Sequence, residues 1–261
     1  MKYKLEAKKS LGQNFLNNKT VIKKIVEEAN KYIETDTQIL EIGPGTGELT
    51  EEILNKFTKN KVFCIEADDR AIPLLEDRFP QKDHKNLKII HKDIRKFDVN
   101  TEKDIRDYII IANIPYYLTG YIIKQFLESK KQPKAMILMV QKEIGDRAKD
   151  KKKSLFSLGI ETYGDSYNFL KVSRGNFTPA PKVDSVVLII HNINRNIFSD
   201  KKVDFEKKYW ETTKKAFNSK RKQLGSTLKI KDDKYKNKRP EELKPVDWIY
   251  ITELLYNNLN E

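Results

Sequence analysis

Apolar residues form short continuous runs between residues 38 and 140, and the segments between these runs carry apolar residues at helical spacing. The continuous runs predict buried strands at 38–42, 61–65, 87–90, 108–112 and 135–140. The helical spacing predicts helices at 19–32, 49–57, 70–79, 119–129 and from 141 onward. Buried strands that alternate with helices indicate a parallel sheet with helices on both faces.

The pattern changes after residue 165. Two further strands are expected at 168–172 and 183–190, and a proline-containing loop at 177–181 joins them. This arrangement favours an antiparallel hairpin at the end of the sheet. From residue 192 onward the helical spacing continues without a convincing strand. We therefore predict an α/β domain over 1–192 and a small helical domain over 193–261.

Four polar features each follow a predicted strand: the glycine turn 43–47, Glu66, Asp93 and Asn113. Ligands of open parallel sheets bind at the carboxyl ends of the strands, so we expect these features to share one site. Glycines at every second position of the turn depart from the G-x-G-x-x-G spacing of dinucleotide sites, and Pro44 removes a backbone donor. The turn favours a compact cofactor without phosphate, such as S-adenosylmethionine. A dehydrogenase stays an alternative that nucleotide binding would test.

Glu66 and Asp93 are candidate acceptors for such a cofactor. A carboxylate in the position of Glu66 can accept hydrogen bonds from both ribose hydroxyls, a role that serves NAD and S-adenosylmethionine alike. Asp93 can accept from the adenine amine of the cofactor, with the backbone N–H of Ile94 reaching the ring. Either acid alone fits a solvated loop equally well. Their placement at successive strand ends favours the functional interpretation.

The run Asn113-Ile114-Pro115-Tyr116 has the chemistry of an amine methyltransferase. An adenine amine is a poor nucleophile because its lone pair is delocalised into the ring, so it must become pyramidal to accept a methyl group. The Asn113 side-chain oxygen and the Ile114 carbonyl are two acceptors for the amine hydrogens, and Pro115 fixes the direction of that carbonyl. Tyr116 offers a ring on which the base can stack, which contributes about 1–3 kcal/mol.

The charge balance indicates a polyanionic partner. Lysine and arginine total 51 against 38 acids, which gives a formal net charge of +13. Nucleic-acid-binding proteins are commonly this basic, although a lysine-rich proteome gives the same balance. The one cysteine, Cys64, leaves no partner for an internal disulfide and fits a reducing compartment. Without a long apolar window we expect neither a signal peptide nor a membrane span, and we expect a cytoplasmic protein that binds no metal.

Six segments, in order between residue 8 and about residue 222, resemble the ribosomal RNA adenine dimethyltransferases, the KsgA family. They read KKSLGQNFL from residue 8, EIGPG from 41, NIPYY from 113, VQKE from 140, FTPAPKVDS from 177 and, less closely, AFNSKRK from 216. The resemblance implies a Rossmann-like class I methyltransferase sheet that uses S-adenosylmethionine as the methyl donor.

The resemblance also implies residue roles. The implied cofactor-binding positions are Asn14, Leu16, Gly43, Gly45, Glu66, Asp93 and Asn113. Asn14 and Leu16 belong to an N-terminal arm that would close over the cofactor, and Gly43 would contact its methionine part. Asn113 would also touch the target amine. Tyr116 and Phe177 would sandwich the target adenine, because a flipped base needs both faces covered.

The family's known substrate is a pair of adjacent adenosines in the hairpin loop near the 3′ end of small-subunit ribosomal RNA, each of which receives two methyl groups. We therefore expect a role in small-subunit maturation, with the immature small ribosomal subunit as the partner of a monomeric enzyme. The expected phosphate contacts are Lys8, Lys9, Lys142, Arg147, Lys220, Arg221 and Lys222. The chain departs from the family pattern at Lys153, Lys220 and Gly225. Lysine lacks the bidentate fork of arginine, so we expect the same charge footprint with a different docking geometry.

Two further alternatives stay open. A related branch of enzymes methylates large-subunit ribosomal RNA and confers antibiotic resistance. The segments at 12–16 and 181–185 and the long tail favour the small-subunit branch. A non-catalytic RNA-binding assembly factor could keep the same fold, and the intact run 113–116 argues against it. Assays with both subunit RNAs and a labelled cofactor would separate these alternatives.

Overall fold

The computed structural model describes residues 5–257, apart from the side chains of Lys9 and Asn257. The chain forms two compact units, the first made of residues up to 145 with 167–193, and the second of 146–166 with the residues from 194 onward. The later limit lies next to the boundary expected at 192–193. The segment 146–166, expected in the first domain, belongs to the second unit because its helix packs against two later helices.

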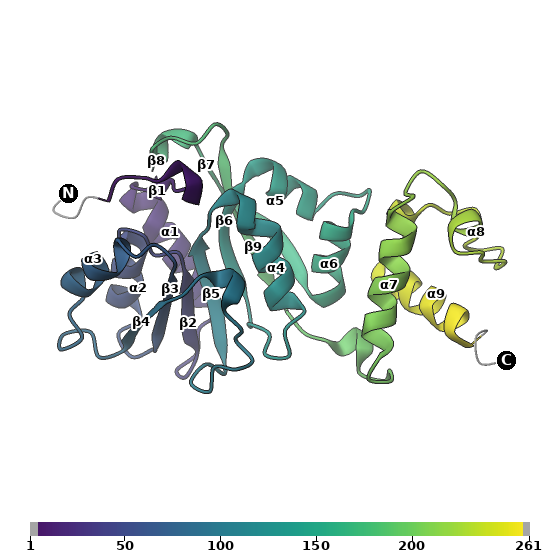
Figure 1. The fold of residues 1–261 in the computed structure, drawn as a ribbon, viewed down its shortest axis with the longest axis horizontal. Coiled ribbons are helices and arrows are strands. Elements are labelled where there is room, and N and C mark those ends of the chain that lie inside the picture. The colour runs from purple at the N-terminus through teal and green to yellow at the C-terminus, as the bar shows by residue number, and fades with distance from the viewer. Residues whose placement is uncertain (1–4, 258–261) are drawn as a thin grey trace. The chain divides into compact units, whose positions relative to one another are not determined.

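A seven-stranded sheet forms the centre of the first unit, in the order β4-β3-β2-β5-β6-β9-β7 (Figure 1). Five neighbouring strands are parallel: β4 (Leu87–His91), β3 (Val62–Glu66), β2 (Gln38–Ile42), β5 (Tyr108–Asn113) and β6 (Met136–Gln141). β9 (Ser185–His191) runs antiparallel to β6, and β7 (Asp165–Val172) lies beside β9 at the edge. The expected mostly parallel, Rossmann-like sheet with an antiparallel end is confirmed.

Helices lie against both faces of this sheet. The flanking helices are α1 (Lys19–Ala29), α2 (Glu48–Lys56), α3 (Ala71–Arg78), α4 (Thr119–Leu127) and α5 (Lys142–Ala148). Alternate strand residues such as Ile39 and Ile109 pack with α1, α2 and α3 in one hydrophobic cluster. The intervening residues point to the other face, where the ring of Tyr108 lies 6.4 Å from that of Phe126 in α4. Burial on both faces explains why the strands read as continuous apolar runs.

The structure contains one strand pair that the apolar pattern does not predict. β1 (Phe15–Leu16) pairs antiparallel with β8 (Phe177–Thr178), so that Leu16 lies opposite Phe177. The side chain of Asn17 extends this contact by donating to Thr178 Oγ1 at 2.7 Å. The N-terminal arm is thereby tied to the loop before β9. Strands of two residues carry no detectable periodicity, which is why the sequence pattern misses them.

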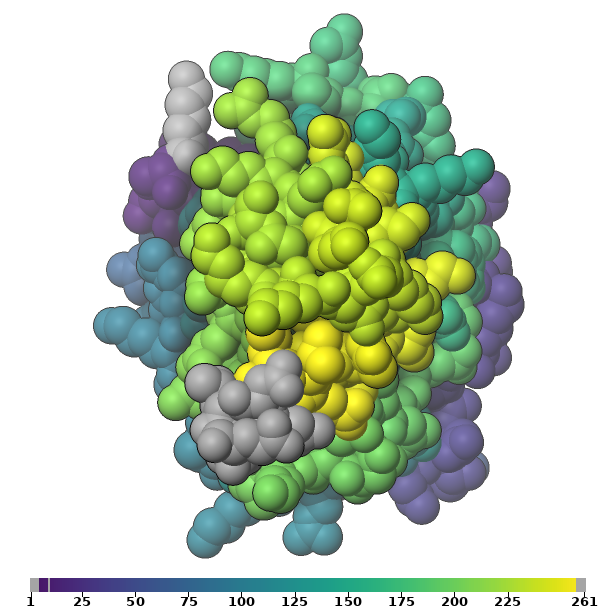
Figure 2. Space-filling model, turned by 90° about the vertical axis from the view of Figure 1, so that its right-hand side faces the viewer, coloured from purple at the N-terminus to yellow at the C-terminus, as the bar shows by residue number. Residues whose placement is uncertain are grey.

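The second unit is helical, as expected. Its helices are α6 (Leu155–Tyr163), α7 (Phe205–Phe217), α8 (Leu224–Thr227) and α9 (Pro245–Asn257). Trp210 of α7 donates to the Tyr163 hydroxyl at 3.0 Å. The Tyr235 hydroxyl, from the loop after α8, donates to Asp247 of α9 at 2.9 Å. In Figure 2 the yellow-green residues of this loop and the yellow residues of α9 form one continuous surface.

Candidate cofactor and methyl-transfer site

A pocket lies at the carboxyl ends of the parallel strands of the first unit. The structure brings these predicted residues into its lining: Asn14, Leu16, Gly43, Gly45, Glu66, Asp93, Asn113 and Tyr116. Two different parts of the chain build the pocket. One side, the strand-end wall, consists of Glu41, residues 43–46 of the glycine turn, Glu66, Asp93 and Asn113. The other side, the arm wall, consists of residues 11–16.

The glycine turn follows β2 and uses its three glycines for different purposes. Gly43, Gly45 and Gly47 have φ angles of 70°, 56° and 81°, a left-handed region that favours glycine. A Cβ at Gly43 would find nothing within 4 Å, so the backbone there faces open space in the pocket. A Cβ at Gly47 would lie 2.6 Å from the Phe79 ring, so this glycine serves packing. The Gly45 N–H donates to the Glu66 carboxylate at 3.0 Å.

Glu66 ends β3 with its carboxylate held by backbone donors. One oxygen accepts from Gly45, and the other accepts from the N–H groups of Ala67 and Asp68, both at 2.8 Å. The side chain is almost fully buried, and this burial raises its pKa while the backbone donors lower it. Oε2, which accepts from Gly45 alone, keeps further acceptor capacity. The expected contact of Glu66 with ribose hydroxyls stays a prediction.

Glu41 is a pocket residue that sequence reasoning did not single out. It lies in β2, is 1% exposed, and lines the pocket beside the glycine turn. One of its oxygens accepts from the Thr50 hydroxyl at 2.7 Å and from the Cys64 thiol at 3.3 Å. Burial raises its pKa to about 7. An acid inside an otherwise apolar strand was the available signal, because buried carboxyl groups are rare without a purpose.

Asp93 lies after β4 and is engaged by Arg95. The two Asp93 oxygens accept from the Arg95 backbone N–H at 2.9 Å and from its guanidinium at 2.5–3.0 Å. The Arg95 side chain holds the pKa of Asp93 below its ordinary value. Asp93 is therefore an ionised acceptor at the pocket edge. Its expected contact with an adenine amine stays a prediction.

Asn113 ends β5 and is oriented by the arm. Its Nδ2 donates to the backbone carbonyl of Asn14 at 3.0 Å, which leaves Oδ1 as the acceptor end of the amide. The following Ile114 is 2% exposed. The Tyr116 hydroxyl shares a 2.7 Å hydrogen bond with Ser185 Oγ, where β9 begins. Burial raises the pKa of Tyr116, so its hydroxyl stays protonated and the ring is held at one edge.

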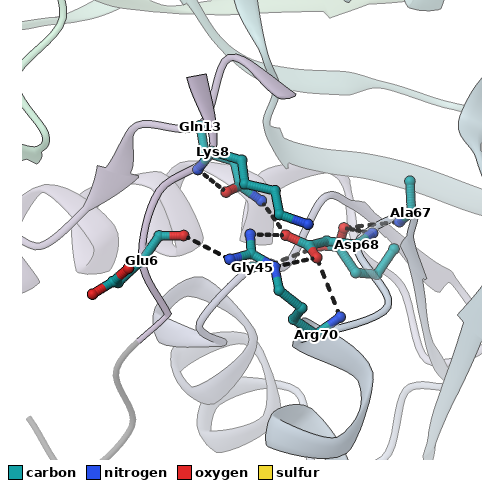
Figure 3. A network of polar contacts seen from close by, with 8 residues as sticks. Glu6, Lys8, Gln13, Gly45, Ala67, Asp68 and Arg70 are labelled. Atoms are coloured by element: carbon teal, nitrogen blue, oxygen red, sulfur yellow. Dashed lines mark hydrogen bonds and ion pairs between the residues drawn. The ribbon is translucent and has the colours of Figure 1, made fainter. Parts of the chain in front are cut away.

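Every arm residue from 12 to 16 contacts a distant part of the first unit, and three of them contact other residues of the pocket lining. A Cβ at Gly12 would lie 3.1 Å from the Tyr117 ring, and a Cβ at Gly45 would lie 2.8 Å from the Phe15 ring. Gln13 donates to Asp68, Asn14 accepts from Asn113, and Leu16 pairs with Phe177. Figure 3 shows the Gln13 contact, with Gln13 and Arg70 both directed at Asp68. Sequence reasoning named Asn14 and Leu16, and it missed Gln13, Phe15 and Asp68.

Phe177 is not part of the pocket lining. It lies in β8, is 4% exposed, and belongs to the hydrophobic cluster beneath the sheet face. Its expected stacking role stays a prediction.

The expected phosphate contacts lie on both units. Lys8 and Lys142 of the first unit and Arg147 of the second are exposed, as are all three basic residues at 220–222. The guanidinium of Arg147 lies 5.6 Å from the Phe156 ring centre. The Lys9 side chain lies outside the described residues. Lys153 forms an ion pair with Glu161 at 2.7 Å, so the departure from the family pattern there has a structural use.

The chemical groups of the pocket fit S-adenosylmethionine. Its walls present the carboxyl groups of Glu41, Glu66 and Asp93. A pyrophosphate would be repelled by the ionised carboxylate of Asp93, whereas a cofactor with a sulfonium, an ammonium and ribose hydroxyls finds acceptors in all three groups. The open side of Gly43 gives room for close approach to the backbone. The compact, phosphate-free cofactor expected from the glycine spacing therefore suits the groups present.

Comparison with known proteins gives the family. A model of the ribosomal RNA adenine dimethylase family matches residues 4–244. The chain belongs to the ribosomal RNA adenine dimethylase family. Members are S-adenosylmethionine-dependent enzymes that dimethylate adenine in ribosomal RNA, so the predicted enzyme class and cofactor are confirmed.

Curated members of the dimethylase family cover most of the chain. It is 36% identical over 233 residues to ribosomal RNA small subunit methyltransferase A of Clostridium botulinum (strain ATCC 19397 / Type A), which covers 87% of this chain and 82% of that protein. It is 37% identical over 232 residues to the protein of the same name from Dehalococcoides mccartyi (strain ATCC BAA-2100 / JCM 16839 / KCTC 5957 / BAV1), with 87% and 76% covered.

Solved structures share the fold of this dimethylase. A dimethyladenosine transferase from Plasmodium falciparum matches with a TM-score of 0.76 and 24% identity, covering 94% of this chain and 98% of that one. The 23S rRNA methyltransferase ErmE matches with a TM-score of 0.70 and 21% identity, covering 93% and 100%. Both confirm the expected methyltransferase fold.

Membrane spans and metal clusters are both absent from the part of the chain that the structure describes. Within residues 5–257, none of the helices is both long and apolar enough to cross a bilayer. The same residues contain no group of three or more His, Cys, Asp or Glu side chains arranged to hold a metal ion.

Proposed function

We propose that this enzyme dimethylates the N6 amines of two adjacent adenosines in the 3′-terminal hairpin loop of small-subunit ribosomal RNA, during maturation of that subunit. The observation that carries the proposal is the position of the run 113–116 in the same pocket as Gly43 and Glu66. Relatives named small subunit methyltransferase A support the choice of RNA, because they align with most of the chain.

Asn113 and Ile114 prepare the target amine. The Asn14 carbonyl holds the nitrogen end of the Asn113 amide, so Asn113 Oδ1 serves as an acceptor for one amine hydrogen. The Ile114 carbonyl, directed by Pro115, accepts the other. These two acceptors favour the pyramidal amine, whose lone pair is free to react. The amine proton is acidic after transfer and passes to water, so the residues provide positioning and exclusion of water rather than a strong base.

Tyr116 holds the adenine ring in place. Its own ring is fixed by Ser185 through the 2.7 Å hydrogen bond between their hydroxyls. Stacking on this ring contributes about 1–3 kcal/mol to base binding. Phe177 is proposed to cover the second face of the base when RNA is bound.

Bound S-adenosylmethionine supplies a methyl group already activated on a sulfonium. Glu66 accepts from the ribose hydroxyls, since its carboxylate is held in place by three backbone N–H groups. Gly43 admits the methionine part, Gly45 holds Glu66, and Asp93 accepts from the adenine amine of the cofactor. Asn14 and Leu16 cover the cofactor from the arm.

RNA docking rests on exposed basic residues of both units, with residues 193–261 as a helical RNA-docking domain. The proposed phosphate contacts are Lys8, Lys9, Lys142, Arg147, Lys220, Arg221 and Lys222. Each contact that releases a counterion makes binding weaker at higher salt, so methylation should fall steeply with ionic strength. We propose a cytoplasmic monomer that acts on the immature small ribosomal subunit.

The test is methyl transfer from labelled S-adenosylmethionine to unmodified small-subunit and large-subunit RNA, followed by mapping of dimethyladenosine. Wild-type enzyme should label two adjacent adenosines of the small-subunit RNA alone. Asn113→Ala should lower transfer at least about a hundredfold, because misplacing a reacting group costs that much. Asn55→Ala, on the exposed side of α2, is the matched control and should leave transfer unchanged.

The alternatives give distinct results in this assay. Labelling of large-subunit RNA alone would replace the proposed substrate with that of the resistance enzymes. Cofactor binding without transfer to either RNA would identify an assembly factor. Full activity of Asn113→Ala would contradict the role of the run 113–116.

A further inference from the structure

Asp68 is a buried acid that links the two walls of the cofactor pocket. It follows β3 by two residues and is 2% exposed. Its carboxylate accepts from Arg70 Nε at 2.9 Å and from an Arg70 terminal nitrogen at 2.6 Å. It also accepts from Gln13 Nε2 at 2.8 Å. The Arg70 guanidinium, and to a lesser extent Gln13, hold the pKa of Asp68 well below its ordinary value, so the acceptor is ionised.

Gln13 provides a donor for the Asp68 carboxylate from the arm. While its Nε2 donates to Asp68, its Oε1 accepts from the Lys8 backbone N–H at 2.9 Å. Arg70 makes a second contact with the arm by donating to the Glu6 carbonyl at 3.1 Å. The close view in Figure 3 shows Gln13 and Arg70 directed at Asp68, with Lys8 in contact with Gln13 and Glu6 in contact with Arg70. A stretch of arm from residue 6 to residue 13 is thereby fastened to the loop after β3.

The same loop carries the acceptor for the ribose. The Asp68 N–H donates to Glu66 at 2.8 Å, so one residue holds Glu66 through its backbone and Gln13 through its side chain. On the arm, Gln13 directly precedes Asn14, whose carbonyl receives Asn113 Nδ2. Opening the arm therefore requires breaking the Gln13–Asp68 bond. A hydrogen bond to a buried charge is among the stronger polar contacts in a protein.

We propose that Asp68 is a positioning residue that fastens the arm over bound S-adenosylmethionine and so sets how long the cofactor stays bound. Gln13, Asp68 and Arg70 form this arm clasp. When the clasp is closed, Asn14 and Leu16 cover the pocket. When it opens, the arm wall leaves and the cofactor exchanges, while the strand-end wall keeps its shape.

Substitutions that change the donor Gln13 and the acceptor Asp68, singly and together, test the proposal. Gln13→Glu places two carboxylates against each other, which breaks the clasp by repulsion. Asp68→Asn removes the charge and weakens the contact. The double variant Gln13→Glu with Asp68→Asn removes the repulsion between the two carboxylates, and the introduced carboxylate still accepts from the Lys8 backbone N–H. Asp69→Asn, an exposed acid next in the same loop, is the matched control.

Two measurements on the enzyme report whether the arm clasp is closed or open. The first is the dissociation rate of S-adenosylmethionine, measured by chasing labelled cofactor with unlabelled cofactor. The second is the rate of tryptic cleavage after Lys8 in the presence of the cofactor. Gln13→Glu should raise both rates by about tenfold or more, as expected for loss of a hydrogen bond to a buried charge. The double variant should lower both rates from those of Gln13→Glu toward those of the wild type, and Asp69→Asn should leave the wild-type rates unchanged.

Other results would overturn the proposal. A lower melting temperature with unchanged dissociation and cleavage rates in Gln13→Glu would make the clasp a purely structural contact. Faster cleavage with unchanged dissociation would show that the arm does not retain the cofactor. Failure of the double variant to recover would show that the pairing of Gln13 with Asp68 is not the determinant. The wild-type binding measurement stands apart from these outcomes, because it tests the cofactor itself.

Discussion

The two walls of the cofactor pocket are built by different physical means. The strand-end wall belongs to the parallel sheet, where Glu66 and Asn113 end buried strands and the glycine turn follows another. The arm wall contains a 3₁₀ turn and a two-residue strand, and it is held by contacts of single side chains with distant partners. The first wall is fixed when the core folds. The second depends on a few polar contacts whose loss leaves the core intact.

This difference assigns separate tasks to the walls. Residues that must keep a constant geometry, such as Glu66, are held by backbone N–H groups in the strand-end wall. The residues proposed to let the cofactor enter and leave are in the arm wall. Segments that open readily have few buried apolar contacts, and of the arm residues 11–16 only Leu16 is buried.

The buried acid of the strand-end wall gives the largest expected effect on stability. Burial raises the pKa of Glu41 from 4.5 to about 7, so the folded chain holds a proton in this range that the unfolded chain releases. Glu41 therefore makes the free energy of unfolding fall as pH rises from about 4.5 to 7. Glu41→Gln should remove this fall, gaining about 3 kcal/mol relative to the wild type between pH 5 and pH 8 in urea unfolding.

The arm wall should respond to pH in the opposite sense. Arg70 lowers the pKa of Asp68, so its stabilising contribution is present above the ordinary value of 3.8 and is lost only as pH falls further. The contribution of the Asp68 contacts to stability should thus be constant between pH 5 and pH 8.

The prediction for Glu41 has a matched control. Glu27→Gln, which changes an exposed acid of α1, should leave the pH dependence of stability unchanged. A difference between Glu41→Gln and the wild type that does not change with pH would contradict the assignment.

Substitutions of Gly43 and Gly47 should separate an effect on cofactor affinity from an effect on packing and stability. In Gly43→Ala the new methyl group enters open pocket space, so cofactor affinity should fall by about 1–3 kcal/mol, the usual cost of overpacking. In Gly47→Ala the methyl group meets Phe79, so the melting temperature should fall more than in Gly43→Ala. Calorimetric titration and thermal unfolding of both variants measure the two effects. Equal losses of cofactor affinity in Gly43→Ala and Gly47→Ala would contradict these separate roles of the two glycines.

Removal of the hydrogen bond between Tyr116 and Ser185 should have the smallest effect of the changes considered. Tyr116→Phe and Ser185→Ala each remove the hydrogen bond between the two residues and keep the stacking ring, which should cost about 0.5–1.5 kcal/mol of transition-state stabilisation. The double variant should lose no more than either single one, because the pair acts as a unit. Steady-state kinetics with the RNA substrate measure these costs. Additive losses would show that the two hydroxyls act separately.

The sequence predicted the strand-end wall well and the arm wall poorly. Strands and turns have local signatures, since apolar runs mark β2, β3 and β5 and glycines mark the turn after β2. The contacts of Gln13 with Asp68 and of Asn14 with Asn113 join residues far apart in the chain, and no local pattern encodes them. Phe177 was expected over a base; it pairs with Leu16 and belongs to the hydrophobic cluster, and its stacking role stays a prediction.

The hydrogen bond from Asn113 to the Asn14 carbonyl also decides which end of an amide faces the substrate. An asparagine side chain has an oxygen and a nitrogen of nearly equal size, and rotation by half a turn exchanges them. If the NH₂ group of Asn113 faced the adenine amine, two donors would face each other and no hydrogen bond could form. The arm removes this ambiguity, because only the nitrogen end can donate to Asn14. In the proposed mechanism the arm thus has a second task beside retaining the cofactor, since its backbone selects the reactive rotamer of a residue at the end of β5.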